Sequence, residues 1–535
     1  MWGQHVRRYG SRCSATLTGH PAPTIAAPPP PQTARPKVSL VALGCPKNTV
    51  DGEVLLGDLQ RTGFDITTDH SDADAVLVNT CAFVEDAKAE SLEAIMAAAA
   101  LNADGKQRRI VVTGCLAQRY AEQLAADLPE ANLVVGFERY GSLASSLRSH
   151  MGLPALPDQP ASPLPTTSAQ PSPSQPASPT SLDASSSSSG SSGTSAATAV
   201  STSGPGQQQG GRVQVGSATV PFRPEWDRVR LTPRHSAYLR VAEGCNHACT
   251  FCAIPGFRGK FRSKPWDALL AEARHLVAGG AVELNLIAED TNQYGMDKRD
   301  GRGLAHLLRE LGQLEGLRWI RILYAYPSYF TQELVEEIAS NPKVCKYIDM
   351  PLQHISNLVL LAMNRPPQDH TLALLGRLRD SIPHLALRTT FINGFPGETD
   401  EQHRELVNFC KTFKFERMGS FAYSEEDGTP AATYPTQTPA KVRERRRDEL
   451  TSLQQRVGEQ WAARLVGQEV DVLVDGYNDD GWLIGRTQWD APDVDPIVFL
   501  SEPSDPGVPP LEVGQIRRCL VDSNSLFDLE AHPIA

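Results

Sequence analysis

The sequence predicts an α/β fold with three folded units: a Rossmann-like N-terminal domain, a partial (β/α)6 barrel and a small antiparallel β-barrel. Strand-like apolar runs alternate with helix-length segments over residues 38–150 and again over 223–463, which predicts parallel sheets. Residues 464–535 instead contain short alternating runs separated by Gly, Asp and Pro turns, a pattern typical of a small barrel. Two compositionally distinct segments, 1–37 and 151–222, lie outside these units.

Length, charge and cysteine content narrow the class of protein. The chain has 535 residues, enough for several hydrophobic cores, and no run approaches the roughly eighteen apolar residues of a membrane span, so no membrane partner is expected. A net charge of -11 argues against wholesale coating of nucleic acid. Ten cysteines are too few for a disulfide scaffold, and their grouping favours metal binding in a reducing compartment.

The two segments outside the predicted units have different compositions. Residues 1–37 are basic and rich in hydroxyl side chains, and no acid precedes Asp51, which is typical of an organelle transit peptide. A Pro-rich tail without an address is the alternative. We favour the chloroplast because the segment is rich in Ser, Thr, Ala and Pro, with the mitochondrion or cytoplasm as alternatives. Residues 151–222 are rich in Pro, Ser, Gly, Ala and Gln, which predicts a flexible linker or insertion.

Six strand-like runs, separated by helix-length stretches, define the central unit. They span residues 237–244, 283–290, 317–325, 346–352, 386–394 and 416–424. Six units are too few for a closed eight-stranded barrel, so we expect an open barrel. Its chemistry should lie at the C-terminal ends of the strands.

The stretch "EGCNHACTFCAIPG", Glu243–Gly256, places Cys245, Cys249 and Cys252 within eight residues. No fourth cysteine closes a tetrahedral zinc site, and His247 lies between two of the cysteines on a short loop, where binding the same metal would be strained. We interpret His247 as a neighbour of the site. Three cysteines on a four-iron cluster leave one iron free to bind a small molecule, as a catalytic cluster requires.

Three further cysteines each end an apolar run upstream. Cys45 ends "VSLVALGC", Cys81 ends "AVLVNTC" and Cys115 ends "IVVTGC", at spacings of about 35 residues. Parallel strands joined by helices bring their C-terminal ends to one edge, so these thiols should converge. The alternative is three small core residues, since free cysteine is often buried. Their equivalent positions favour a second cluster with an open iron.

The motif C-x-x-x-C-x-aromatic-C, which Phe251 completes, resembles the signature of the radical S-adenosylmethionine superfamily. Two open clusters in one chain resemble its methylthiotransferase family, as do "SLVALGCPKNTVDGE", "LNLIAEDTNQYG" and "PLQHISNLVLLAMNRP". The resemblance implies two [4Fe-4S] clusters, S-adenosyl-L-methionine as cofactor, and a TRAM-like C-terminal barrel. It also implies the ligands: Cys45, Cys81 and Cys115 for an auxiliary cluster, and Cys245, Cys249 and Cys252 for the radical-generating cluster.

Two branches of this family differ in substrate. The stretches "GCPKN", "GCLAQRY", "RTTFINGFPGE" and "APDVD" resemble the branch that modifies a small-subunit ribosomal protein of the decoding centre. The resemblance implies hydrogen abstraction from the β-carbon of an aspartate, followed by methylthio insertion, and it implies an electron donor and a sulfur donor as partners. The alternatives are a methylthiotransferase acting on transfer-RNA adenosine and a non-catalytic protein whose cysteines bind structural zinc.

Charge in the last unit agrees with a protein substrate. Residues 467–535 carry fourteen acids against three arginines, which suits a basic ribosomal protein better than phosphate. We expect Trp482 and Trp489 in the core of that barrel.

Two residues depart from the family pattern near predicted strand ends. Glu289 stands where glutamine is usual, and Asn393 stands where an aliphatic residue is usual. They either alter the cofactor pocket or are neutral. The four remaining cysteines are assigned to tail, core or surface, and these are Cys13, Cys345, Cys410 and Cys519.

Overall fold

The computed structural model describes residues 35–154, 211–222, 225, 227–503, 505 and 507–534. The predicted transit segment, except for its last three residues, and residues 155–210 of the predicted linker lie outside this part of the chain. Cys13 lies outside it as well. Within the described ranges, no helix combines the length and the hydropathy that a membrane crossing requires.

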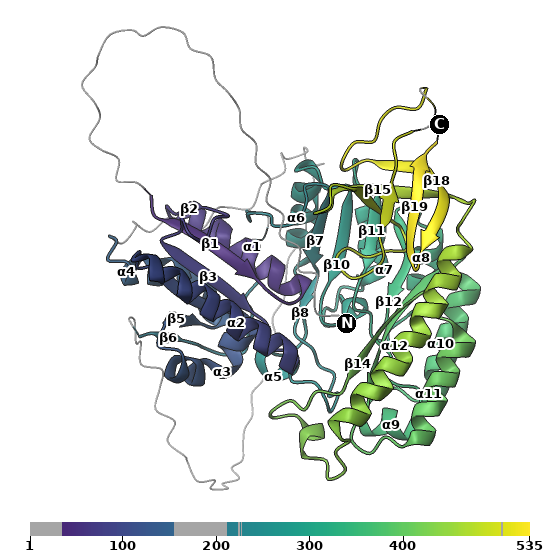
Figure 1. Ribbon diagram of the computed structural model, residues 1–535, viewed down its shortest axis with the longest axis horizontal. Helices are drawn as coiled ribbons and strands as arrows, with labels where there is room; N and C mark the ends of the chain where they lie inside the picture. Colours follow the sequence, from purple (N-terminus) through teal and green to yellow (C-terminus); the bar gives the residue numbers. More distant parts are fainter. Residues whose placement is uncertain are drawn as a thin grey trace, which may run out of the picture.

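The N-terminal domain is a six-stranded parallel sheet flanked by helices, drawn in purple and blue in Figure 1. The strand order is β2-β1-β3-β4-β5-β6, so the order reverses between β1 and β3, where ligands bind in doubly wound folds. The strands are β1 (Lys37–Ala42), β2 (Asp65–Ile66), β3 (Ala75–Thr80), β4 (Arg109–Thr113), β5 (Ala131–Val135) and β6 (Val213–Gln214). The helices are α1 (Pro46–Arg61), α2 (Glu85–Ala100), α3 (Gly114–Asp127) and α4 (Leu143–His150).

The linker prediction is wrong for residues 211–222, which belong to this domain. β6 pairs in parallel with β5, where Val213 lies opposite Val134, and Val220 is buried. This short strand returns from a distant part of the chain to extend the edge of the sheet. Its two residues are too few to show a periodic pattern, and the sequence before it is rich in Ser and Gly. The strand could therefore not be recognised from the sequence.

The central unit is an open half-barrel of six parallel strands in sequential order, which confirms the predicted partial (β/α)6 barrel. Each predicted run overlaps one of these strands. They are β7 (Ser236–Arg240), β10 (Glu283–Ile287), β11 (Trp319–Ile322), β12 (Val344–Asp349), β13 (Ala386–Asn393) and β14 (Arg417–Ala422), with a small hairpin of β8 (Ala242–Glu243) and β9 (Arg262–Ser263) beside them.

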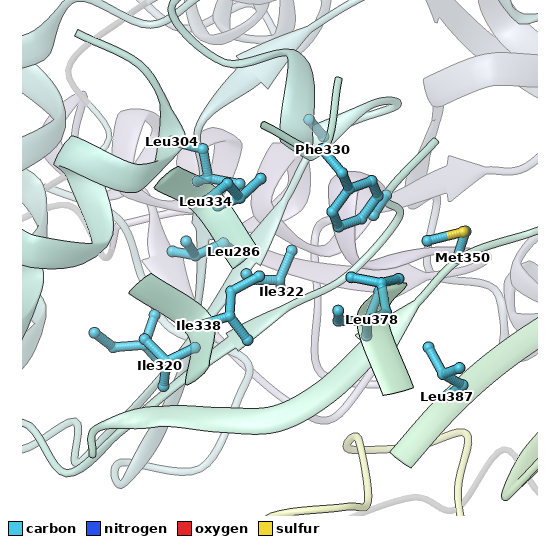
Figure 2. Packing of buried hydrophobic residues seen from close by; sticks show 14 of the residues in the cluster. Leu286, Leu304, Ile320, Ile322, Phe330, Leu334, Ile338, Met350, Leu378 and Leu387 are labelled. Carbon is cyan, nitrogen blue, oxygen red and sulfur yellow. The ribbon is translucent and has the colours of Figure 1, made fainter. Parts of the chain in front are cut away.

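Helices alternate with these strands and cover their outer face. Figure 2 shows the resulting core, in which Leu286 and Ile322 from the sheet pack near Leu334 and Ile338 from a covering helix. Cys345 and Cys410 are buried in the core. The helices are α5 (Ile254–Arg258), α6 (Trp266–Ala278), α7 (Leu304–Gly312), α8 (Gln332–Ser340), α9 (Asn357–Ala362), α10 (Gln368–Ser381), α11 (Asp400–Phe413) and α12 (Ala440–Ala463).

The C-terminal unit is a closed five-stranded barrel, drawn in yellow in Figure 1. Its strands are β15 (Glu469–Tyr477), β16 (Leu483–Thr487), β17 (Val498–Leu500), β18 (Ile516–Ser525) and β19 (Asp528–Pro533). The alternating runs at 469–476, 482–487, 496–502 and 516–523 predicted the first four of these strands but not β19. The pair β17–β19 is parallel, so the barrel is not wholly antiparallel. Cys519 lies in its core.

The two tryptophans of the barrel do not both lie in its core. The prediction is wrong for Trp482, which is 62% exposed at the end of the β15–β16 hairpin. Trp489 sits where the barrel meets the half-barrel, because its Nε1 donates to the His384 carbonyl at 2.8 Å and its ring packs edge-on against Trp461.

Residues of all three units pack together in the interior of the half-barrel. Val50 and Val54 from α1 and Leu473 and Ala491 from the C-terminal barrel form one apolar cluster with residues of the strands, including Tyr347. The core of the half-barrel is therefore completed by its neighbours, and the three units form one packed body.

Acidic side chains of the C-terminal barrel also pair with the half-barrel. Asp495 accepts from the Tyr347 hydroxyl at 2.6 Å, and Asp490 pairs with Arg417. Asp475 pairs with His235, and Asp493 accepts from Tyr238. Part of the negative charge that the sequence suggested for a partner therefore serves internal contacts.

Candidate active site

The three upstream cysteines meet at the C-terminal edge of the N-terminal sheet. Cys45 is the N-cap of α1, Cys81 follows β3 directly, and Cys115 lies in the first turn of α3, after β4. β1, β3 and β4 are adjacent parallel strands, so their ends lie side by side. Gly44 has φ +87, and a Cβ on it would lie 2.9 Å from the Cys81 Sγ. The loop that carries Cys45 thus packs directly against Cys81, and only glycine fits there.

The second trio lies on the loop between β8 and α5. This loop is anchored to α9 and its C-terminal end, because the Thr250 hydroxyl donates to the Ala362 carbonyl at 2.8 Å and Asn364 donates to the Ala248 carbonyl at 2.9 Å. Arg365 contacts the Cys249 Sγ at 3.7 Å. These contacts fix the loop that presents Cys245, Cys249 and Cys252 at the C-terminal mouth of the half-barrel.

His247 has partners of its own. Its Nε2 lies 2.6 Å from Asp290 Oδ2, and its ring stacks on Tyr326 with centroids 3.5 Å apart and planes 8° apart. The ring is therefore held beside the second trio by a carboxylate and an aromatic face, as expected for a neighbour of the site.

Burial alters the acidity of the thiols. It raises the pKa of Cys81 to about 11 and that of Cys115 to about 12, and it raises the pKa of Cys245 and Cys252 to about 12. These four thiols therefore keep their protons at neutral pH unless a cation binds, so metal binding must release these protons.

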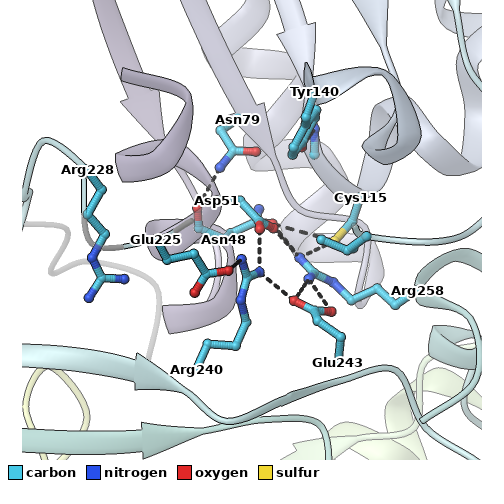
Figure 3. Close-up of polar contacts among 12 residues, drawn as sticks. Asn48, Asp51, Asn79, Cys115, Tyr140, Glu225, Arg228, Arg240, Glu243 and Arg258 are labelled. Carbon is cyan, nitrogen blue, oxygen red and sulfur yellow. Dashed lines mark hydrogen bonds and ion pairs between the residues drawn. The ribbon is translucent and has the colours of Figure 1, made fainter. Parts of the chain in front are cut away.

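A cluster of buried charges lies between the two trios, and Figure 3 shows its contacts. The Arg258 guanidinium lies 2.9 Å from Asp51, 3.4 Å from Glu243 and 3.7 Å from the Cys115 Sγ. Arg240 pairs with Asp51 at 2.5 Å and also with Glu243. Because Asp51 belongs to α1 and the other charged groups belong to the half-barrel, this cluster joins the two domains.

Lys47 also crosses the boundary between these domains. It lies in the first turn of α1, only two residues after Cys45, and it is 6% exposed. Its Nζ lies 3.5 Å from the centre of the Tyr324 ring and 3.4 Å from the Ala288 carbonyl oxygen. Both partners follow strand ends of the half-barrel, so Lys47 faces its C-terminal mouth.

The two departures from the family pattern both lie at that mouth. The Glu289 side chain is 2% exposed, its carboxylate lies 3.9 Å from Arg258, and neither oxygen has a hydrogen-bond partner among the described residues. Asn393 ends β13 and donates to the Ser420 hydroxyl at 2.9 Å and to the Phe421 carbonyl at 3.2 Å. Asn393 therefore has a local structural role, whereas Glu289 has an unused acceptor.

Sequence reasoning missed Lys47, Asp51 and Arg258 as members of the site. Lys47 and Asp51 stand within "GCPKNTVDGE", a stretch that already carried the family resemblance, so their signal was present but unused. Arg258 had no such signal, because its partners come from residues 51 and 243, and only the fold brings these positions together.

The donor set suits iron–sulfur chemistry and a cationic ligand. Each trio offers three soft thiol ligands, as iron–sulfur clusters require. Among the described residues, no group of His, Cys, Asp or Glu is arranged to hold a single metal ion. The Glu289 carboxylate lies 3.9 Å from Arg258 but accepts no hydrogen bond from the described residues, so it suits a ligand with a positive group, and S-adenosyl-L-methionine carries an amine and a sulfonium. The residues present therefore fit these groups.

Comparisons with known proteins agree with this arrangement. Three family models match the chain: Uncharacterized protein family UPF0004 over residues 37–136, the Radical SAM superfamily over 239–410, and the TRAM domain over 466–534. These matches fall on the cysteine-bearing N-terminal sheet, the half-barrel and the C-terminal barrel.

Curated relatives match nearly the whole chain. "Ribosomal protein uS12 methylthiotransferase RimO" of Geobacter sulfurreducens is 40% identical over 499 residues, which cover 93% of this chain and 98% of the relative. The protein of the same name from Trichlorobacter lovleyi is 38% identical over 94% of this chain and 99% of the relative. These comparisons confirm the resemblance, and the chain therefore belongs to the RimO family of radical SAM methylthiotransferases.

Proposed function

We propose that this protein transfers a methylthio group to the β-carbon of an aspartate in ribosomal protein uS12. The nearly full-length relationship to uS12 methylthiotransferases supports this substrate. The observation that carries the proposal is the placement of two cysteine trios on either side of one domain boundary. Arg258 spans that boundary, since it contacts the Cys115 Sγ and pairs with Glu243, two residues before Cys245.

We assign one [4Fe-4S] cluster to each trio: Cys45, Cys81 and Cys115 to the auxiliary cluster, and Cys245, Cys249 and Cys252 to the cluster that binds S-adenosyl-L-methionine. When bound, these groups supply radical chemistry at an unactivated carbon and a carrier for sulfur, neither of which any side chain can provide.

The chain's own residues hold and shield the reacting groups. Gly44 and Gly114 allow the close backbone approaches that bring the upstream thiols together, because a Cβ on Gly114 would lie 2.3 Å from the Thr80 carbonyl oxygen. The buried pairs of Arg258 and Arg240 with Asp51 close the domain boundary between the trios. A closed boundary keeps water away from a reactive intermediate.

The reaction also needs an electron donor, a sulfur donor and a compartment that contains uS12. An electron donor must reduce the cluster at Cys245, Cys249 and Cys252, and a sulfur donor must supply the auxiliary site. We further propose that residues 1–37 direct the protein to an organelle, the chloroplast in the first instance, where a bacterial-type ribosome provides uS12. Fusion of residues 1–37 to a fluorescent protein tests this, and a cytoplasmic signal would contradict it.

The activity is tested by anaerobic reconstitution of the full chain with iron and sulfide. Incubation with reductant, S-adenosyl-L-methionine and purified uS12 should add one methylthio group in place of one hydrogen on an aspartate, as read by peptide mass spectrometry. Cys115→Ser and Cys252→Ser should abolish the product, whereas Cys410→Ser, a change of a core cysteine on α11, should keep it. Methylthiolated adenosine in transfer RNA with unmodified uS12 would overturn the proposal, as would a colourless protein with stoichiometric zinc.

A further inference from the structure

Lys47 is a buried cation with no ion-pair partner among the described residues. Its ammonium can donate three hydrogen bonds, but within the same residues it makes one, a 3.4 Å contact to the Ala288 carbonyl, besides lying over the Tyr324 ring. Within the described part of the chain, no carboxylate oxygen lies within 4.0 Å of its Nζ. A buried charge is costly unless an opposite charge pairs with it, so this position is suited to an anion that comes from outside the chain.

Three acids of this part of the site already face arginines. Asp51 lies within 2.9 Å of Arg258, and Glu289 lies 3.9 Å from the same guanidinium. Asp349 pairs with Arg388 at 3.0 Å. Arginines therefore face these three acids, and Lys47 remains available.

Lys47 also lies near both cysteine trios. It follows Cys45 by two residues, and its contacts at Ala288 and Tyr324 lie at the C-terminal mouth of the half-barrel. Glu289, next to Ala288, is close enough to act electrostatically on both Lys47 and Cys252. Lys47 thus stands between the two trios. The proposed substrate is an aspartate, whose carboxylate is bonded directly to the β-carbon that reacts.

We propose that Lys47 binds the carboxylate of the target aspartate and so places its β-carbon between the two cysteine trios. This inference rests on the proposed function, because the anion that Lys47 lacks is the group that defines the substrate. An asparagine at the same position presents no charge to the ammonium, so Lys47 would also set the preference for aspartate.

The support beneath Lys47 is rigid. Tyr324 adopts the left-handed conformation with φ 60, and its backbone N–H donates to Asp349 at 3.1 Å. Asp349 pairs with Arg388, whose Nε lies 3.3 Å from Asp495 of the C-terminal barrel. The aromatic ring that holds Lys47 is therefore fixed by a chain of polar contacts that reaches the third domain. A fixed cation can position a reacting carbon, whereas a mobile one cannot.

The test is a double-mutant cycle on binding by the reconstituted full chain. Dissociation constants are measured for uS12 and for uS12 with asparagine at the target position, using the wild type, Lys47→Met and Lys47→Arg. Because a hydrogen bond to a charged group is stronger than one between neutral groups, the wild type should prefer aspartate by about 10- to 150-fold. Lys47→Met should bind both proteins with equal, weaker affinity, and Lys47→Arg should restore part of the preference.

Lys88→Met is the matched control. Lys88 is another lysine at the boundary between the N-terminal domain and the half-barrel, but it is paired internally, with Glu426 at 3.2 Å and Glu85 at 2.7 Å. This variant should keep the full preference for aspartate, and the absorbance of the clusters should be unchanged in every variant.

Three outcomes would refute the role of Lys47. If Lys47→Met still discriminates aspartate from asparagine, the residue is structural. If that variant loses affinity for S-adenosyl-L-methionine while its uS12 preference is unchanged, Lys47 serves the cofactor. If its clusters fail to assemble, while Lys88→Met assembles them, Lys47 supports the auxiliary site. Failure of the wild type to modify uS12 at all would instead overturn the proposed function, so the two failures are distinguishable.

Discussion

Replacing Arg258 with methionine removes the buried cation at the boundary between the N-terminal domain and the half-barrel. Methionine keeps most of the aliphatic stem, so the change tests charge rather than volume. It leaves Asp51, Glu243 and Glu289 without the guanidinium that lies 2.9, 3.4 and 3.9 Å from them. Arg240 still pairs with Asp51 and Glu243, so the damage is confined to one side of the cluster.

The magnitude follows from the distances. At an effective dielectric constant of about 20, the attraction across the 2.9 Å contact to Asp51 is about 6 kcal/mol. Desolvation of the guanidinium offsets several kcal/mol of this, and removal of one partner of a buried ion pair typically costs about 3–5 kcal/mol. Because the freed carboxylates regain water when the two domains separate, this cost should favour opening of the boundary over unfolding of either domain.

Native-state hydrogen exchange of the reconstituted protein measures that opening. Amides of α5 and of the first turn of α1 should exchange faster by roughly two to three and a half orders of magnitude, since each 1.4 kcal/mol is tenfold. The control is Arg309→Met, because Arg309 is 48% exposed and solvent therefore screens its pairs with Glu333 and Glu337. The Arg309→Met substitution should raise the exchange rates of nearby amides by less than about fivefold. If the boundary amides of Arg258→Met exchange less than tenfold faster than those of the wild type, Arg258 does not hold the boundary closed.

Two further predictions concern cluster assembly and acid stability. Gly114→Ala should lower the iron content by about half, because a Cβ there would lie 2.3 Å from the Thr80 carbonyl oxygen and displace Cys115. The control is Gly376→Ala on α10, where an added Cβ would have no neighbouring atom within 4 Å, and this variant should keep all the iron. Equal iron content in the two variants would contradict the prediction. Glu398 is buried, which opposes ionisation, but His354, His403 and Arg446 outweigh this and lower its pKa from 4.5 to about 2. Its contribution to the free energy of unfolding is therefore present above pH 4.5 and is lost as the pH falls towards 2. Urea titrations should show a shallower acid loss for Glu398→Gln than for the wild type, and parallel curves would exclude this role.

The sequence predicted those features of the fold and site that depend on local patterns. The six strands of the half-barrel carry apolar runs between helix-length segments, and these patterns persist whatever the tertiary context. The convergence of Cys45, Cys81 and Cys115 followed from chain topology, because adjacent parallel strands bring their ends together. Both cysteine trios could therefore be predicted from the sequence.

The features that sequence reasoning missed depend on contacts between distant residues. Arg258 resembles any surface arginine until Asp51, 207 positions earlier, is brought to it. The count of acids in the C-terminal barrel misled for the same reason, since Asp490 and Asp495 are neutralised by arginines of the half-barrel. Formal charge can be counted from a sequence, but the charge that faces solvent depends on which partners the fold supplies.

One face of α1 links the chemistry of the site to the packing of the domains. Lys47, Val50, Asp51 and Val54 are spaced three and four residues apart, so they lie on the same side of the helix. Val50 and Val54 enter the apolar interior of the half-barrel, Asp51 joins the arginine cluster, and Lys47 reaches Tyr324. Cys45 caps the same helix.

The adjacent side of α1 packs into the N-terminal core through Leu55 and Leu59, so the helix is buried on two sides. Any movement that opens the domain boundary must therefore shift Lys47 and expose Val50 and Val54 together, and the cost of that exposure resists partial opening. Weakening of the arginine cluster should then disturb the position of Lys47 as well as the domain contact. On this basis Arg258→Met should reduce the preference for aspartate over asparagine even though Arg258 does not contact Lys47's proposed ligand, whereas Arg309→Met should leave that preference unchanged.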